Sequence, residues 1–119
     1  MSPLILVVDD DESIRDLVAM ALAPLGYIVI GAADGCEAMA MIAARPPVLV
    51  ISDVEMPDVD GLELYRALRA RPETETLPFV FVSCSDRVKS LGTEAPPSLR
   101  KPFALERLVA LVLEVLSEA

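Results

Sequence analysis

Several polar side chains in this sequence stand directly after short apolar runs, and their types are those that handle phosphoryl groups. They are the carboxylates of Asp9, Asp10 and Asp53, the hydroxyl of Ser83 and the ammonium of Lys101. Carboxylates that lie close together repel and raise one another's pKa unless a cation neutralises them. Hard oxygen ligands with a partly aqueous shell select Mg²⁺. In such a site a carboxylate attacks the phosphorus atom of a phosphoryl group. The metal ion, the lysine and the hydroxyl neutralise the equatorial oxygens of that group.

The apolar runs that precede these residues predict strands. Residues 48–52 form a largely β-branched run that ends at Asp53, and a loop rich in Pro, Asp and Gly follows. Such a run is typical of a strand buried on both faces of a parallel sheet. Further strands are predicted at residues 4–8, 27–30, 79–82 and, more briefly, 98–100. Because parallel strands end at one edge of the sheet, their terminal polar residues should meet there.

Helices are predicted between these strands. Apolar residues at helical spacing indicate helices over about 12–25, 35–44, 61–71 and 105–116. Asp34 and Asp60, each followed three residues later by Glu, resemble capping boxes. Asp11 and Glu12 suit a helix N-terminus better than a metal site. Strands and helices alternate five times, which predicts an α/β domain with a parallel sheet between two helical layers.

Composition excludes several classes of protein. The 119 residues are 54% hydrophobic and 4% aromatic, which excludes a disordered chain and predicts one domain, residues 1–119, with an aliphatic core. No apolar run approaches the roughly 20 residues of a membrane span, and no signal peptide is recognisable. The net charge of −9, without a Lys/Arg cluster, argues against direct nucleic-acid binding. Cys36 and Cys84 are expected to be free buried thiols in a reducing cytoplasm.

At this point a family resemblance is plain. The segments VVDDD, SDVEMPDVDG, FVFVSCSD and LRKPF resemble the receiver domain of two-component response regulators, over essentially the whole chain. The resemblance implies a flavodoxin-like doubly wound (βα)5 fold with strand order 2-1-3-4-5. It also implies that Asp53 is the phosphoryl acceptor and that Asp10 binds Mg²⁺ directly. Asp9 would assist through water, and Glu55 would contribute its backbone carbonyl.

The same resemblance assigns the other two residues. Ser83 would be the switch hydroxyl that moves to the phosphoryl group, Lys101 would pair with that group, and the Lys101–Pro102 peptide bond would be cis. One segment departs from the family pattern. The connection over residues 86–97 is short, which predicts a shortened or irregular fourth helix, and Ser98 stands where the family usually has an aromatic residue. The departure concerns the readout of the signal rather than the phosphorylation chemistry.

We therefore expect a phospho-acceptor switch in the cytoplasm that receives its phosphoryl group from a sensor histidine kinase or a phosphotransfer protein. No output domain is expected within the chain, and no enzymatic activity beyond its own phosphoryl transfer and dephosphorylation. Output would come from docking to a partner or from a phosphorelay. The predicted inward stripe of the last helix consists of Leu105, Val109, Val112 and Leu116, flanked by Leu108 and Val115. Leu111 falls outside this stripe and Leu113 at its margin, and they are either scattered exposed residues or a homodimer face.

Three rival functions stay open at this stage. The first is a pseudo-receiver, a protein-interaction module whose output does not depend on phosphorylation. The second is a flavin-binding electron carrier of the same fold, although the acids after the first strand would repel a phosphate there. The third is a Mg²⁺-dependent phosphatase with Glu55 as general acid, for which 119 residues leave no substrate-binding cap domain.

Overall fold

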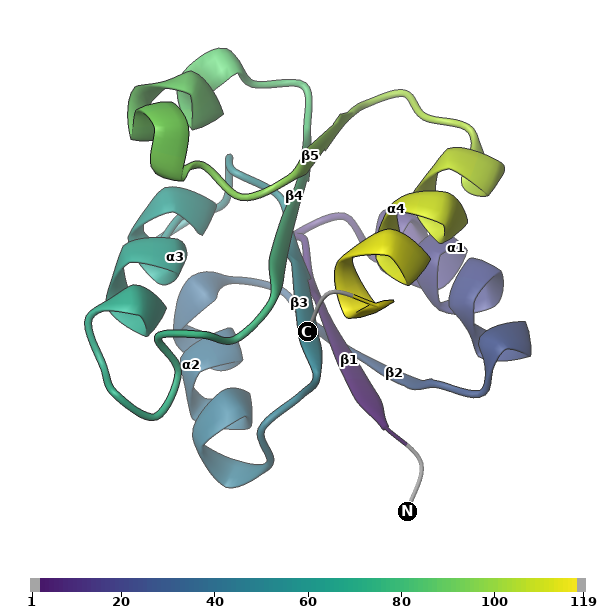
Figure 1. Ribbon diagram of the computed structural model, residues 1–119, viewed down its shortest axis with the longest axis horizontal. Helices are drawn as coiled ribbons and strands as arrows, with labels where there is room; N and C mark the ends of the chain where they lie inside the picture. The colour runs from purple at the N-terminus through teal and green to yellow at the C-terminus, as the bar shows by residue number, and fades with distance from the viewer. Residues whose placement is uncertain (1–2, 118–119) are drawn as a thin grey trace.

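A five-stranded parallel sheet lies between two helical layers in the computed structural model, which describes residues 3–117 (Figure 1). The strands are β1 (Leu4–Val8), β2 (Ile28–Ala32), β3 (Leu49–Ser52), β4 (Phe79–Ser83) and β5 (Ser98–Arg100). The helices are α1 (Glu12–Leu22), α2 (Gly35–Ala44), α3 (Gly61–Arg69) and α4 (Leu105–Ser117), with 3₁₀ segments η1 (Ala23–Leu25) and η2 (Asp86–Glu94). The strand order β2-β1-β3-β4-β5 confirms the predicted flavodoxin-like fold.

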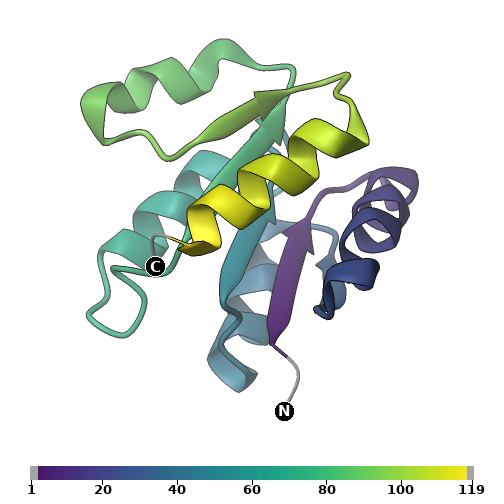
Figure 2. The same ribbon diagram turned by 45° about the vertical axis from the view of Figure 1, so that its right-hand side comes forward.

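The two faces of the sheet are covered by different pairs of helices. Helices α2 and α3 lie on one face and α1 and α4 on the other (Figures 1 and 2). Every residue of β1, β3 and β4 is buried, because successive side chains enter opposite layers and both layers are apolar. This explains why these strands are uninterrupted apolar runs in the sequence. The edge strand β2 is only partly buried.

Three of the five aromatic residues gather under α3. The rings of Tyr65, Phe79 and Phe81 contact one another, with centroids 5.1 Å apart for Tyr65–Phe79 and 4.9 Å apart for Phe79–Phe81. Such edge-to-face pairs add to the stability that burial of their area provides. Because Phe79 and Phe81 belong to β4, this cluster joins α3 to the strand that ends at Ser83.

The helix starts follow the predicted caps. Asp11, Asp34 and Asp60 each accept a hydrogen bond from a backbone N–H in the first turn of α1, α2 and α3. At Asp60 the capping box is complete, since the Glu63 side chain also accepts from the Asp60 backbone N–H. The structure thus confirms Asp11 as a cap.

Several details differ from the sequence prediction. Strand β2 extends to Ala32, two residues beyond the predicted end, and α3 ends at Arg69 rather than near residue 71. Cys36 and Cys84 were expected to be buried, and this prediction was wrong because both are exposed. Cys36 lies in the first turn of α2, where Gly35 and Ala38 occupy the buried positions.

The inward face of the last helix is also rotated relative to the prediction. Leu108 and Val112 are its fully buried residues, and Leu111, which was placed outside the stripe, is half-buried against the core. Leu113 is 47% exposed. A homodimer through this helix stays a prediction. Within residues 3–117 no helix, α4 included, has the length and apolarity required to cross a bilayer.

The segment after β4 is irregular, as predicted. η2 consists of 3₁₀ turns interrupted at Gly92, whose φ of 65° is a left-handed conformation that glycine adopts without a steric penalty. Ser98, which stands where the family usually has an aromatic residue, is exposed at the start of β5. No aromatic side chain from β5 therefore enters the space between η2 and the sheet.

Candidate functional site

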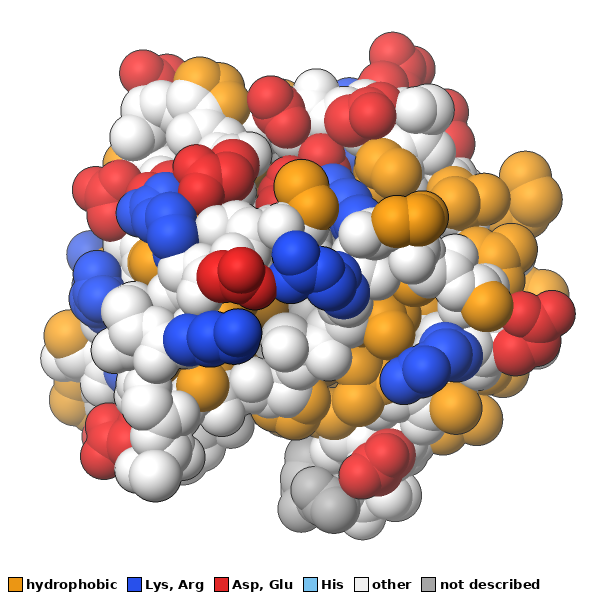
Figure 3. All heavy atoms as spheres, turned by 90° about the horizontal axis from the view of Figure 1, so that it is seen from above, with side chains coloured by type: hydrophobic (Ala, Val, Ile, Leu, Met, Phe, Trp, Pro, Cys, Tyr) orange, Lys and Arg blue, Asp and Glu red, His pale blue; other side chains and the backbone are white. Residues whose placement is uncertain are grey.

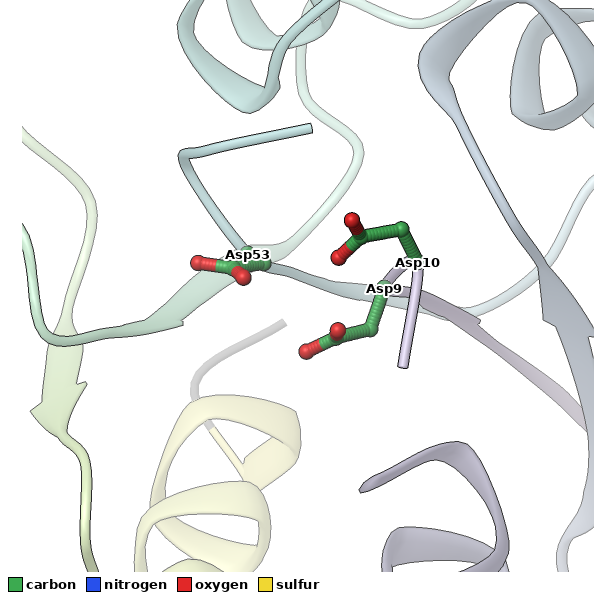
Figure 4. A group of neighbouring side chains, drawn as sticks. All are labelled: Asp9, Asp10 and Asp53. Carbon is green, nitrogen blue, oxygen red and sulfur yellow. The ribbon is translucent and has the colours of Figure 1, made fainter. Parts of the chain in front are cut away.

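Three carboxylates meet at the carboxyl ends of β1 and β3. Asp9 and Asp10 follow β1, Asp53 follows β3, and their side chains are neighbours at this edge of the sheet (Figure 4). Each offers a carboxylate oxygen that lies within 4.8 Å of the other two. The register explains the convergence, because Val8 pairs with Ser52 and the Asp53 N–H donates to the Val8 carbonyl at 2.9 Å. The sequence prediction that these residues meet is confirmed.

Lys101 reaches the same cluster from the end of β5. Its Nζ lies 2.7 Å from Oδ2 of Asp9 and 3.2 Å from Oδ2 of Asp53, and its side chain is 19% exposed. Its backbone N–H donates to the Ser83 carbonyl at 3.1 Å, which ties the end of β5 to β4. The Lys101–Pro102 peptide bond is cis, as the resemblance implied.

Burial and charge act against each other in this group. Burial is the largest influence on Asp9 and raises the pKa of its carboxyl, although hydrogen bonds from Lys101 and from the Asp11 backbone oppose the shift. Repulsion between carboxylates, which we expected to raise this pKa, has only a small part in it, because the charge of Asp53 contributes least. Burial pushes the pKa of Lys101 downward, yet its contacts with Asp9 and Asp53 outweigh burial and raise that pKa overall.

The raised pKa of Asp9 predicts a pH-dependent effect of removing its charge. Because folded Asp9 binds a proton more tightly than unfolded Asp9, its stabilising contribution is present below the unfolded pKa and is lost as pH rises through the folded pKa. Without Mg²⁺, Asp9→Asn should therefore gain in free energy of unfolding over wild type as pH rises from about 3 to 7. Urea unfolding at several pH values measures this difference. A difference that shrinks with rising pH would contradict it.

Two predicted site residues have other contacts in this structure. Ser83 is buried, and its Oγ accepts a hydrogen bond from the backbone N–H of Ser85 at 3.1 Å. Glu55 is exposed, and its carboxylate contacts Arg87 at 3.0 Å. The switch role of Ser83 and the metal-ligand role of the Glu55 carbonyl stay predictions.

Arg87 was not singled out in the sequence, although it joins η2 to the loop after Asp53. Its guanidinium contacts Glu55 and also Oδ2 of Asp60, at 2.8 Å. At the other end of η2, the Tyr65 hydroxyl donates to the Glu94 carbonyl at 3.0 Å. The irregular segment is thus attached at both ends to α3 and its N-cap. Figure 3, which views this end of the molecule, shows acidic and basic side chains side by side.

Loss of the Arg87 contacts should have a local effect. Arg87 is about half exposed, so Arg87→Ala should change global stability little, because exposed ion pairs are weak and screened by salt. Amide hydrogen exchange in residues 86–94 should become faster at low salt, and the difference from wild type should shrink at high salt. Unchanged exchange at low salt would show that Arg87 does not hold η2 in place.

The acidic cluster fits Mg²⁺. Opposite ligands of this ion lie roughly 4 Å apart, because each Mg²⁺–oxygen distance is about 2.0–2.1 Å. The carboxylate oxygens here are within 4.8 Å of one another, so small side-chain adjustments suffice. Asp10 is exposed, which leaves access for the water molecules that Mg²⁺ usually retains. Lys101 neutralises the cluster only in part.

Comparison with known proteins agrees with this geometry. The family model of the response regulator receiver domain matches residues 5–113. The chain belongs to the response regulator receiver domain family. Curated relatives also match most of it. The response regulator MprA from Mycobacterium ulcerans is 45% identical over 114 residues, which are 92% of this chain and 48% of the relative. MprA from Mycobacterium tuberculosis is also 45% identical over 92% of this chain. The chain spans about half the length of these curated relatives.

Solved receiver structures have the same fold. The chemotaxis protein CheY4 of Vibrio cholerae is 34% identical, with a TM-score of 0.87 over 97% of this chain and 99% of that one. The signal receiver domain of a histidine kinase from Syntrophus aciditrophicus is 30% identical, with a TM-score of 0.90 over 99% of this chain and 92% of that one. This protein is therefore a receiver domain of the two-component type.

Proposed function

We propose that this receiver domain accepts a phosphoryl group on Asp53, with Mg²⁺ bound, from the phosphohistidine of a sensor histidine kinase or phosphotransfer protein. The observation that carries the proposal is the position of the Asp53 carboxylate, which lies beside the acids that follow β1 and 3.2 Å from the Lys101 ammonium. Asp10 would bind Mg²⁺ directly, Asp9 through water and Glu55 through its carbonyl. The charge that the reaction adds would shift Ser83 and alter partner binding.

The chain's own residues account for most of the proposed step. A carboxylate oxygen of Asp53 attacks phosphorus, the new O–P bond forms as the N–P bond to the donor imidazole breaks, and that imidazole leaves and takes up a proton. The Val54 N–H, which donates to Oδ1 of Asp53 at 2.7 Å, holds the carboxylate in place. Lys101 keeps an ammonium beside Oδ2, where the phosphoryl oxygens would gather charge. When bound, Mg²⁺ would supply further neutralisation of those oxygens.

We also propose where the domain acts and what its output is. The domain would catalyse no reaction other than its own phosphorylation and dephosphorylation, and it would act in the cytoplasm. Its output would be a changed affinity for a downstream protein. The apolar residues of α4 that remain exposed, Leu113 above all, are compatible with a homodimer.

Phosphorylation by a small donor tests the proposal. The protein and Asp53→Asn are incubated with acetyl phosphate and Mg²⁺, and their intact masses are compared. The wild-type chain should gain the mass of one phosphoryl group and Asp53→Asn should gain none. An unmodified wild type, at Mg²⁺ concentrations at which binding has been measured, would refute the proposal.

The second candidate is a pseudo-receiver whose partner binding does not depend on phosphorylation. The irregular η2 and the exposed Ser98 favour it. This chain has no aromatic side chain at the position from which other members of the family transmit the state of the acceptor to β5. Beryllofluoride, which mimics the phosphoryl group, separates the two. If it binds at Asp53 while the backbone amides of residues 86–100 keep their NMR positions, the pseudo-receiver is favoured; if those amides shift, the switch is favoured.

A further inference from the structure

Arg15 occupies a position that helix electrostatics does not favour. It lies in the N-terminal part of α1, where the helix dipole favours anions over cations. Glu12 and Asp16 are near it in the sequence, yet within residues 3–117 no carboxylate oxygen lies within 4.0 Å of its guanidinium. Instead, its NH1 donates to the backbone carbonyl of Asp9 at 2.6 Å. The position of Arg15 is therefore explained by this hydrogen bond and not by an ion pair.

Gly31 on β2 makes room for that hydrogen bond. A Cβ atom at position 31 would lie 2.8 Å from Cδ and 3.2 Å from Nε of Arg15. Carbon atoms do not approach so closely, so any larger residue would push the arginine side chain away from its present path. Gly31 pairs with Val7 in the sheet, two residues before Asp9, which places this gap beside the end of β1. Arg15 thus makes the hydrogen bond to the Asp9 carbonyl, and Gly31 leaves the space that this hydrogen bond requires.

The carbonyl that Arg15 holds belongs to the peptide unit that joins Asp9 to Asp10. Because a peptide unit is planar, the direction of this carbonyl fixes the direction in which the chain enters Asp10. The Asp9 N–H donates to the Ala32 carbonyl at 3.0 Å, so the backbone is anchored on both sides of Asp9. The Asp9 carboxylate is held separately by the Asp11 N–H and by Lys101.

Asp10 has no comparable support from its own side chain. It is exposed, and within residues 3–117 its carboxylate makes no hydrogen bond or ion pair with another side chain. Its placement beside Asp53 therefore depends on the backbone. We propose that Arg15, in the space left by Gly31, is a positioning residue that orients the Asp9–Asp10 peptide and so presents the Asp10 carboxylate for Mg²⁺.

This inference rests on the proposed Mg²⁺ site, and the sign of the effect distinguishes it from simple electrostatics. Removing a positive charge next to three carboxylates should, by Coulomb's law alone, make Mg²⁺ bind more tightly. Loss of a group that orients a metal ligand makes the metal bind more weakly, typically by a factor of about 10–100. Positioning and charge therefore predict opposite changes for the same variant.

The experiment measures Mg²⁺ affinity of the purified domain by calorimetry, without any phosphoryl donor. Arg15→Met and Gly31→Ala should each weaken Mg²⁺ binding, by on the order of tenfold. The double variant should bind about as weakly as Arg15→Met alone, because both changes remove one hydrogen bond. Arg71→Met is the matched control. It removes the same charge from an exposed side chain just beyond the C-terminal end of α3, and it should bind Mg²⁺ as wild type does.

The outcomes separate the inference from the function on which it rests. If wild type binds no Mg²⁺, the proposed function fails. If wild type binds and Arg15→Met binds equally or more tightly, only the positioning role is refuted. Additive losses in the double variant would also refute it, since they would mean two independent contacts. Gly31→Ala keeps every charge of the chain and provides the same test if Arg15→Met does not fold.

Discussion

Gly61→Ala should destabilise the domain by about 3 kcal/mol and abolish phosphorylation of Asp53. Gly61 is buried and is the first residue of α3. Its N–H donates to the Val54 carbonyl at 2.9 Å. A Cβ atom there would overlap the backbone carbonyl oxygen of Asp53. Because that oxygen belongs to the main chain, it cannot turn aside as the end of a flexible side chain would. Relief requires the loop that carries the acceptor to move.

Gly26→Ala is the control for this variant. Gly26 has a φ of 90°, and a Cβ atom there would meet no other atom within 4 Å, so alanine brings backbone strain but no collision. Its cost should be about 1 kcal/mol, and phosphorylation should be normal. Urea unfolding and the acetyl phosphate assay provide both readouts. If Gly61→Ala is as stable and as readily phosphorylated as Gly26→Ala, the close approach of α3 to Asp53 does not matter.

Lys101→Met should lower the free energy of unfolding by about 2 kcal/mol in the absence of Mg²⁺. The substitution keeps most of the volume of the side chain but leaves Asp9 and Asp53 facing each other without their shared cation. Removing one partner of a fully buried ion pair costs about 3–5 kcal/mol. We expect a smaller loss, of about 2 kcal/mol, because the Lys101 side chain is 19% exposed. Phosphorylation should also slow strongly, since the ammonium beside Oδ2 of Asp53 is lost.

Two comparisons make the Lys101 prediction specific. Lys89→Met removes the same charge from a side chain that is 83% exposed and should leave stability almost unchanged. Added Mg²⁺ should stabilise Lys101→Met more than wild type, because a cation can then occupy a more negative cluster. A Lys101→Met protein that is as stable as wild type without Mg²⁺ would show that the two carboxylates do not need the lysine.

The main features of the fold could be predicted from the sequence, because the hydrophobic pattern of each of these segments matches its burial in the structure. The strands β1, β3 and β4 are buried on both faces, so their apolar runs are unbroken, and the caps at Asp34 and Asp60 depend only on neighbouring residues. The meeting of Asp9, Asp10 and Asp53 followed from parallel strands alone. The strand order and the individual roles of the site residues came from the family resemblance.

Other features depend on contacts between distant parts of the chain. Arg87 meets Glu55 and Asp60 only after η2 has folded back over α3, and no spacing in the sequence indicates this. The exposure of Cys36 depends on which face of α2 turns toward the sheet. Because α2 is short and consists mostly of apolar residues, its sequence does not indicate which face is buried. A signal did exist for Arg15, because a cation near the start of a helix is unfavourable unless a specific contact compensates.

Identification of the phosphorylated residue tests the central claim most directly. After treatment with acetyl phosphate and Mg²⁺, borohydride reduces an acyl phosphate on aspartate to homoserine, and mass spectrometry of peptides locates the change. The conversion should occur at Asp53 and be absent when the donor is left out. Conversion at Asp9 or Asp10, or an unconverted Asp53 in a protein that has gained a phosphoryl group, would contradict the assignment of Asp53 as the acceptor.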